Sequence, residues 1–299
     1  MQEEKMHQVN RQLEDPRDFI RLGTLAGILA SQPRTLPDLQ LLVRCLEDPN
    51  ADVRRLAVEV LAMGVPDTVD ALTLALSDVQ PYPVRIGASM ALARTGPSAS
   101  SAVEALGRCL HDGEKTLRWH ASFALGKIGE PAVPSLRACL SETEPAVVTA
   151  AANSLEWIGR KAKDAAQDLV QAAEKAPPAS NLQQACLAAL VSVTGDTAAG
   201  VPVFLKNLQE GDENAKIASL QELEEIAPIA ADSVPYLFPC LQDASGKVRM
   251  TAAKTLAAFG SHASTALSLL EQLAQDPDEA VSKAAHSAIE RISAANPGD

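Results

Sequence analysis

Aromatic residues are scarce in this sequence. Only 3% of its 299 residues are Phe, Trp or Tyr, and just two are tryptophans. Aromatic and β-branched residues are enriched in β-sheets, whereas alanine and leucine, which dominate here, are among the best helix formers. The composition therefore argues against a sheet and favours closely packed helices.

The chain also lacks an excess of basic residues, long apolar runs and paired cysteines. With a net charge of −12, a long basic track for a nucleic-acid backbone is not expected. No apolar run reaches the roughly 20 residues that a membrane-spanning helix needs, and Met1 to Asp18 carries too many charges for a signal peptide. Five cysteines, an odd number without close pairs, indicate reduced thiols. We therefore expect a cytoplasmic protein that binds no nucleic acid and does not insert into a membrane.

What the sequence does contain is a repeated helical pattern, clearest at residues 116–129. Leu117, Ala121 and Leu125 fall on one face of a helix with 3.6 residues per turn. Gly129 can end that helix in a left-handed conformation. Aligning the chain on Leu125 reveals nine units at intervals of 30–35 residues. The equivalent positions are Ile28, Leu61, Leu92, Leu125, Leu155, Leu190, Leu223, Leu256 and Ile289.

A second apolar helix precedes each of these segments, and a short turn with an aspartate separates the two helices in most units. Aspartate near a helix start can accept free backbone N–H groups and carries a favourable charge there. One helix pair cannot bury its own apolar faces, so the pairs must stack. The sequence therefore predicts an all-α superhelix, or solenoid, of about nine helix pairs. The turn aspartates are Asp48, Asp78, Asp112, Asp243 and Asp276.

The Val-Arg-x-x-Ala-x-x-x-Leu pattern and the Ala-Leu-Gly-Lys-Ile-Gly segment at 124–129 resemble HEAT repeats. More narrowly, they resemble the short HEAT-like repeats named after phycobilisome lyases. The resemblance covers essentially all of residues 1–299 and implies one continuous solenoid. Residues 1–32, with a thin apolar stripe on their leading helix, are predicted to form an N-terminal cap, and residues 279–299 a C-terminal cap. The proline pair in residues 176–181 breaks helical structure, so we predict a long turn and a hinge there.

Two repeated sets of polar residues are interpreted as structural. Arginines follow the repeat valine and lie six or seven residues after the turn aspartates, so we expect a ladder between units rather than an anion site. Cysteines precede the repeat leucine in several first helices, which is typical of packing. Metal or iron–sulfur ligands must converge, but only Cys109 and Cys139 lie in adjacent units, so we expect no cofactor. The arginines are Arg54, Arg85, Arg118 and Arg249, and the cysteines are Cys45, Cys109, Cys139 and Cys240.

Consecutive second helices carry apolar side chains where most units have polar or small ones. Positions two and six after the repeat valine lie at about 200° and 240° on the helix, opposite the buried stripe. Second helices usually line the concave face of HEAT arrays, so an aromatic patch is expected there, with Arg55, Arg94 and Lys127 around it. Such patches mark binding sites, and tryptophan is enriched at their hot spots; the alternative is that the tryptophans are partly covered core residues. The predicted partner-binding residues are Ile86, Met90, Trp119 and Phe123 at these positions, and Trp157 at a flanking position in the next unit.

No phosphate-binding loop, triad spacing or paired-carboxylate motif indicates catalysis. We therefore expect a non-catalytic scaffold, or an assembly or chaperone factor, that holds a protein partner on its concave face. The resemblance implies an alternative, a bilin lyase or lyase subunit acting on a phycobiliprotein, in which the aromatic patch would stack on the tetrapyrrole. A third function that the resemblance implies is an accessory role in metallocluster assembly.

Overall fold

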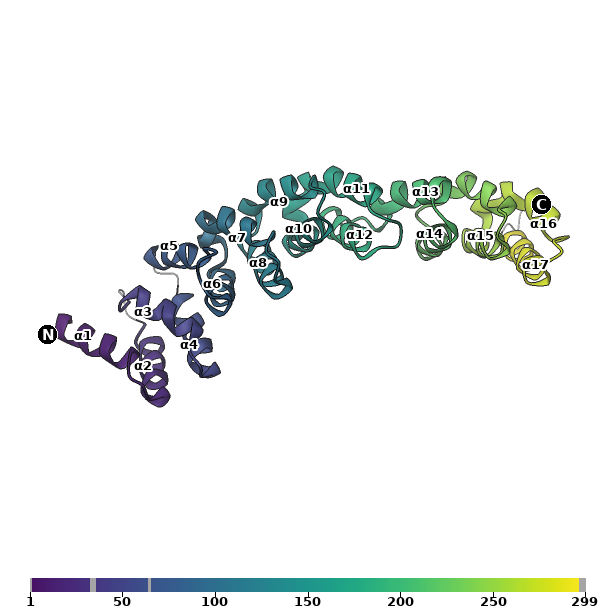
Figure 1. Cartoon of the computed structure of the whole chain (residues 1–299). Coiled ribbons are helices and arrows are strands. Elements are labelled where there is room, and N and C mark those ends of the chain that lie inside the picture. Colours follow the sequence, from purple (N-terminus) through teal and green to yellow (C-terminus); the bar gives the residue numbers. More distant parts are fainter. Residues whose placement is uncertain (1, 33–35, 64–65, 296–299) are drawn as a thin grey trace. The chain divides into compact units, whose positions relative to one another are not determined.

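The computed structural model describes residues 2–32, 36–63 and 66–295. These described residues form helices and turns and contain no strand. They fold into two compact units, Met1–Asp168 and Leu169–Asp299, each built from helix pairs stacked in a row (Figure 1). The described residues contain nine such pairs, as the all-α solenoid prediction requires. None of their helices has both the length and the apolar character needed to cross a membrane.

The first unit contains five helix pairs, with first helices on one side and second helices on the other (Figure 1). Each second helix contacts the second helix of the next pair, so the second helices form one continuous layer within this unit. The first helices are α1 (Gln2–Leu13), α3 (Leu39–Arg44), α5 (Pro66–Ala75), α7 (Val103–Cys109) and α9 (Val133–Leu140). The second helices are α2 (Asp18–Ser31), α4 (Ala51–Leu61), α6 (Tyr82–Thr95), α8 (Lys115–Ile128) and α10 (Pro145–Ile158). Short 3₁₀-helices flank several first helices: η1 (Cys45–Glu47), η2 (Gly96–Ala102), η3 (Glu130–Ala132) and η4 (Gly159–Ala165).

The second unit contains the remaining pairs, beginning with α11 (Ala166–Lys175), which crosses the boundary between the units. Its third pair lacks an α-helical first member, because Pro235 and Pro239 remove backbone donors and leave the 3₁₀-helix η6 (Ala231–Gln242) instead. The second helices are α12 (Asn181–Thr194), α14 (Glu213–Glu225), α15 (Gly246–Ala258) and α17 (Glu279–Ala294). The other first-helix elements are η5 (Thr197–Gly200), α13 (Val201–Glu210), η7 (Gly260–Ala266) and α16 (Leu267–Leu273).

Small side chains at the middle of the second helices allow this close stacking. Each of these side chains is almost fully buried, because a neighbouring helix packs directly against it. A larger side chain would keep the two helices apart. Gly129 ends α8 with a φ of 85°, and its N–H donates to the carbonyl of Leu125. The buried small residues are Ala57, Ala88, Ala121 and Ala151 in the first unit, and Cys186, Ser219, Ala252 and Ala285 in the second.

The predicted turn at residues 176–181 lies between α11 and α12. Ala179 adopts a left-handed φ of 57°, and the Ser180 side chain caps α12 by accepting from the amide of Gln183. Hinge motion there stays a prediction, as do the single continuous solenoid and the terminal caps. Met1 of the predicted N-terminal cap and residues 296–299 of the predicted C-terminal cap lie outside the described residues.

The predicted Arg–Asp ladder is present at some joints and missing at others. Arg54 and Arg118 break it, because each donates only to backbone carbonyls of its own turn and contacts no carboxylate among the described residues. Where the ladder is present, a cation of one pair meets the turn aspartate of the next. These contacts are Arg21 Nε–Asp48 Oδ2 at 2.6 Å, Arg85 Nη1–Asp112 Oδ2 at 2.8 Å, Lys216 Nζ–Asp243 Oδ2 at 2.7 Å and Arg249 Nε–Asp276 Oδ2 at 2.8 Å.

The sequence pattern predicts that the turn aspartates cap the second helices. In the structure they do not cap these helices directly. Asp48 accepts from the amide of Asn50, and Asn50 in turn caps α4. Asp112, Asp243 and Asp276 likewise accept the amide two residues later. Each aspartate therefore shapes the turn and leaves its second oxygen free for the ladder cation.

The cysteines are packing residues, as expected. All five are buried and unpaired. Burial raises the pKa of Cys45, Cys139 and Cys240 to about 11 and that of Cys186 to about 12, so their thiols stay protonated. Within the part of the chain that the structure describes, no three His, Cys, Asp or Glu side chains converge as a metal site would require.

Candidate functional site

The predicted patch lies on the second-helix face of the first unit, and its two indole rings are exposed. Trp119 of α8 retains 50% of its accessible surface and Trp157 of α10 retains 40%. Ile86 and Met90 of α6 and Phe123 of α8 are half-buried. The tryptophans are therefore surface residues that lean on one another, rather than members of the core between helix layers.

Trp119, Phe123 and Trp157 form an aromatic cluster with fixed ring geometry. Trp119 and Phe123, one helical turn apart, stack with their planes 3° apart and their centroids at 5.5 Å. Trp157 stands nearly perpendicular to both, with its centroid 5.2 Å from Phe123 and 6.2 Å from Trp119. Offset stacking and edge-to-face contacts are the favoured aromatic arrangements, so the three rings hold one another in place.

Gly126 explains how Trp157 reaches this cluster. A Cβ atom at Gly126 would lie 2.8 Å from Cβ of Trp157 and 3.1 Å from its Cε3, closer than side chains tolerate. Buried hydroxyls also join the same two helices, since Ser122 Oγ lies 2.9 Å from Ser154 Oγ. Ser122 also donates to the carbonyl of Ala150 at 2.7 Å. The absence of a side chain at Gly126 thus permits the helix approach that brings Trp157 onto Phe123.

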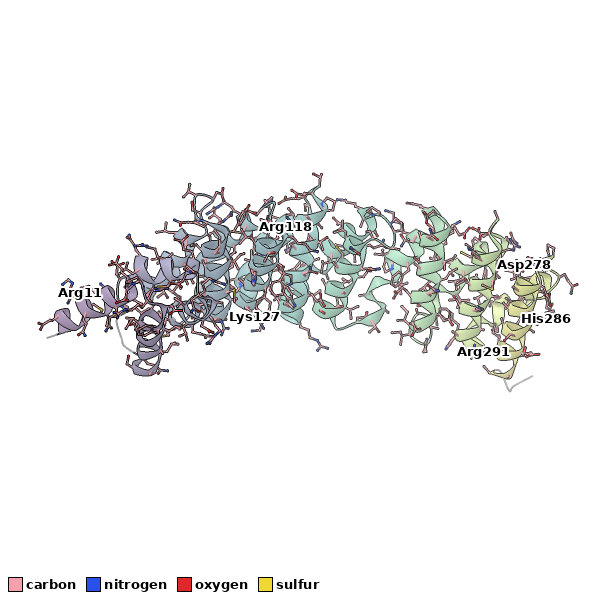
Figure 2. The ribbon with its side chains drawn as sticks, turned by 60° about the horizontal axis from the view of Figure 1, so that its bottom comes forward. Arg11, Arg118, Lys127, Asp278, His286 and Arg291 are labelled. Carbon is pink, nitrogen blue, oxygen red and sulfur yellow. The ribbon has the colours of Figure 1, made fainter. Side chains whose placement is uncertain are left out.

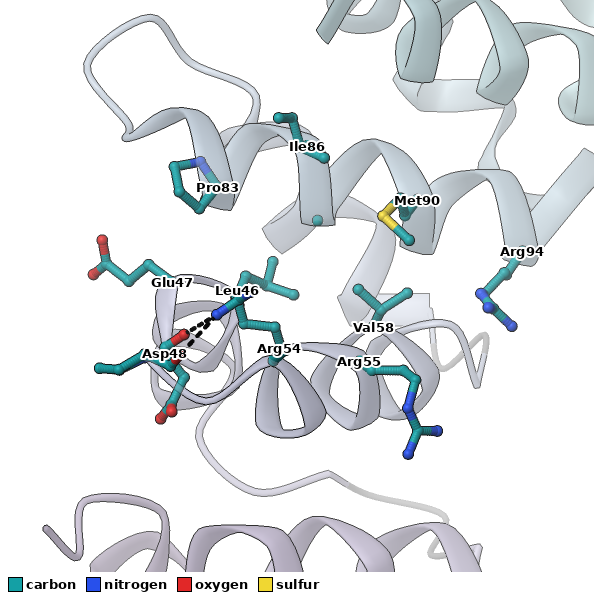
Figure 3. Close-up of a pocket in the computed structure, with 13 residues that line it drawn as sticks. Leu46, Glu47, Asp48, Arg54, Arg55, Val58, Pro83, Ile86, Met90 and Arg94 are labelled. Carbon is teal, nitrogen blue, oxygen red and sulfur yellow. Dashed lines mark hydrogen bonds between the residues drawn. The ribbon is translucent and has the colours of Figure 1, made fainter. Parts of the chain in front are cut away.

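Two neighbouring cavities lie on this face, and only the second is lined by residues of the aromatic cluster; together we call them the second-helix groove. The first, of about 610 Å³, lies between α4 and α6, where Val58 faces Met90, and Ile86 also lines it (Figure 3). The second, of about 420 Å³, lies between α6 and α8 and is lined by Trp119 and Phe123. Met90 and Arg94 line both cavities, so the two share a wall on α6.

The groove combines apolar walls with four cations. Arg54, Arg55 and Arg94 line the first cavity (Figure 3), and Lys127 joins Arg94 at the second. Lys127 lies at the C-terminal end of α8, opposite Arg118 near the start of the helix (Figure 2). An apolar surface with cations at its edge suits a ligand that has both apolar and anionic groups.

His120 lines the second cavity beside Trp119, with their ring centroids 4.8 Å apart and nearly perpendicular. Burial lowers the pKa of His120 below its ordinary value of 6.5, because burial penalises the charged ring. His120 is therefore neutral at pH 7 and adds no further cation to the groove.

The structure brings four of the five predicted residues into one groove: Ile86 and Met90 on α6, and Trp119 and Phe123 on α8. Trp157 lines neither cavity but supports Phe123. That these residues bind a partner stays a prediction. Sequence reasoning missed Pro83, Val58 and Arg54, which also line the groove. Their repeat positions assign them to a helix start, the core and the ladder, so no sequence signal marked them.

Comparison with known proteins agrees with this architecture. The family model of HEAT repeats matches residues 39–121, 103–191 and 201–290. No curated protein matches the sequence.

Several solved structures are similar to this chain at low sequence identity. They include a crystal structure of Kap121p bound to Pho4p, 14% identical, covering 97% of this chain and 37% of that chain with a TM-score of 0.53. An engineered protein of the Northeast Structural Genomics Consortium is 20% identical, covering 95% of this chain and 88% of that chain, with a TM-score of 0.41. The complex of CpcE and CpcF of phycocyanin lyase from Nostoc sp. PCC7120 is 21% identical, covering 86% of this chain and 96% of that chain, with a TM-score of 0.38. Of these, only the likeness to Kap121p has a TM-score above 0.5, and it concerns the fold alone. With family-model matches across most of its length, the chain belongs to the family of HEAT-repeat proteins.

Proposed function

We propose that this protein is a cytoplasmic, non-catalytic scaffold or assembly factor that holds a protein partner on the second-helix face of its first unit. The observation that carries the proposal is the exposed aromatic cluster beside the groove. Both tryptophans of the chain lie there, and both are exposed. Tryptophan is strongly enriched at binding hot spots, and contiguous exposed apolar surface marks interaction sites.

The arrangement of the rings supports this proposal. Because Trp119, Phe123 and Trp157 already contact one another, a partner that docks on them orders few additional rotamers. Each immobilised side chain otherwise costs roughly 0.5–1.5 kcal/mol on binding. Five buried, unpaired cysteines fit a protein that works in a reducing compartment.

The test replaces Trp119 and Phe123 with serine and measures how much partner protein the immobilised chain captures from an extract of its source organism. Leu74→Ser is the matched control, because Leu74 is 74% exposed and lies on α5, among the first helices. We expect the double variant to lose the captured partner and the control to retain it, with helicity unchanged in both and only a modest loss of stability in the double variant, because its ring contacts are removed. A stability loss of about 3 kcal/mol or more per site would mean that the rings belong to the core, and the proposal would fail.

Bilin binding is the alternative outcome that the same variants distinguish. A free bilin is added to the purified protein and its absorbance spectrum is recorded. No spectral change is expected for a protein scaffold. A red-shifted band that disappears in the Trp119→Ser variant would replace the scaffold with a chromophore-binding function.

A further inference from the structure

The charges along the second-helix groove indicate what kind of segment it holds. We propose that its occupant is an acidic segment of a partner protein, with two apolar anchors that enter the two cavities. This inference rests on the proposed function, because it specifies the chemistry of the partner held on the same face.

The groove is basic although the chain is acidic. The chain carries a net charge of −12. The charged residues that line the two cavities are nevertheless four cations and only two carboxylates, Glu47 and Asp48. Asp48 is already neutralised by Arg21, which donates to both of its carboxylate oxygens at 2.6 and 3.0 Å. Negative charge on the partner therefore complements this surface.

Two of the four cations are free to receive a carboxylate. The ammonium of Lys127 lies 5.1 Å from the centroid of the Phe123 ring and contacts no carboxylate among the described residues. Arg54 donates through Nη1 to the backbone carbonyls of Asp48 and Pro49, at 2.6 and 3.0 Å. Both cations thus retain their full charge at the groove.

The other two cations are paired with carboxylates that a ligand can replace, and of these Asp52 is exposed and Glu59 is half-buried. Arg94 contacts Glu59 at 2.8 Å, and Arg55 contacts Asp52 at 3.4 Å. The arginine side chains of these pairs are 48% and 59% exposed. Exposed ion pairs are worth only about 0–1 kcal/mol, so exchanging one carboxylate for another costs little.

The apolar walls define the second requirement. The cavities lie on either side of α6, and packed helices are about 8–10 Å apart. Anchors that enter both cavities must be separated by a similar distance. This corresponds to about five to seven residues of a helix, at 1.5 Å per residue, or about three residues of an extended segment, at 3.3 Å per residue.

The probe is a display library of random 16-residue peptides, selected against the immobilised full chain. Selected peptides are synthesised with a fluorescent label, and their affinity is measured by anisotropy at low and high salt. The groove variant carries Arg94→Gln and Lys127→Gln. The control variant carries Arg108→Gln and Lys163→Gln, which remove the same charge from exposed residues of α7 and η4.

We expect the selected peptides to be enriched in Asp and Glu around two apolar residues. Their affinity should fall about tenfold or more in the groove variant, less than about twofold in the control, and should weaken as salt increases. Replacing Trp119 with serine should also lower the affinity of the chain for the same peptides.

Three other results would overturn the inference. Neutral or basic peptides that still require Trp119 would refute the acidic partner but leave the proposed function intact. A set of peptides indifferent to Trp119 would contradict both. Sedimentation of the unmodified protein is the third measurement: self-association that the groove variant abolishes would show that a second copy of this chain occupies the groove.

Discussion

Replacing Gly126 with alanine should loosen the contact between α8 and α10 and displace Trp157. A Cβ atom at this position would lie 2.8 Å from Cβ of Trp157, and ordinary contact begins at 3.4 Å. Because the backbone of α10 holds that Cβ, rotation of the indole relieves only its own contact, at 3.1 Å to Cε3. The helices must therefore separate, against the hydrogen bonds that join Ser122 to Ser154 and Ala150.

Two opposing effects determine the magnitude. Overpacking in a close-packed site costs about 1–3 kcal/mol, whereas replacing glycine with alanine inside a helix gains about 0.8–1.0 kcal/mol. The clash should outweigh the helix propensity, so we expect a net destabilisation of about 1 kcal/mol.

Gly23→Ala is the matched control. Gly23 lies inside α2, and a Cβ atom there would meet nothing within 4 Å. This variant should therefore gain up to about 1 kcal/mol of stability. The difference between the two variants, about 1–3 kcal/mol, isolates the clash from the helix propensity.

Urea unfolding followed by circular dichroism measures both stabilities, and tryptophan emission adds a local measurement. Both tryptophans of the chain belong to the aromatic cluster, so the emission reports on that cluster alone. The Gly126→Ala variant should shift the emission, and the Gly23→Ala variant should not. If Gly126→Ala were as stable as Gly23→Ala and its emission were unchanged, the close approach of Trp157 to α8 would be refuted.

Two further predictions concern the joints between helix pairs. Arg85→Ala should cost about 3–5 kcal/mol, because it leaves the half-buried carboxylate of Asp112 without its cation; Arg54→Ala, at the same repeat position but without a carboxylate partner, should cost much less in the same urea titration. Burial tends to lower the pKa of His111, but its hydrogen bond to the Glu142 carboxylate outweighs this effect and raises the pKa above 6.5. A histidine whose pKa is raised on folding stabilises the folded state at low pH, and this stabilisation is lost as the pH rises through the folded-state pKa. The stability difference between the unmodified protein and His111→Gln should therefore be larger at about pH 5.5 than at about pH 8.5. An unchanged difference would show that the His111–Glu142 pair does not act in solution.

Much of the fold could be predicted from the sequence because it depends on local periodicity. The position of a residue relative to the apolar stripe decides whether it faces the core or solvent. Trp119 follows Leu117 by two positions, so its exposure follows from the helix period alone. The same argument predicts the burial of Ala121 between second helices.

The ladder shows where this reasoning stops. Arg21 and Arg54 occupy the same repeat position, yet only Arg21 reaches the carboxylate of the next turn, on Asp48. Asp78, the residue that Arg54 would need, lies in an exposed turn and contacts Arg85 instead. Whether a given Arg–Asp ion pair forms depends on how each turn is oriented toward the neighbouring helix pair. The repeated sequence pattern does not indicate that orientation.

The sequence by itself therefore determined the helices, their pairing and the residues that face outward, because these follow from short-range periodicity and from the need of each pair to bury its apolar face. Only the tertiary structure decided that Arg54 and Val58 share a groove with Met90, and that Trp157 rests where Gly126 has no side chain. Such contacts join residues about 30 or more positions apart, and a few tenths of an ångström in the spacing of helices decides whether they form.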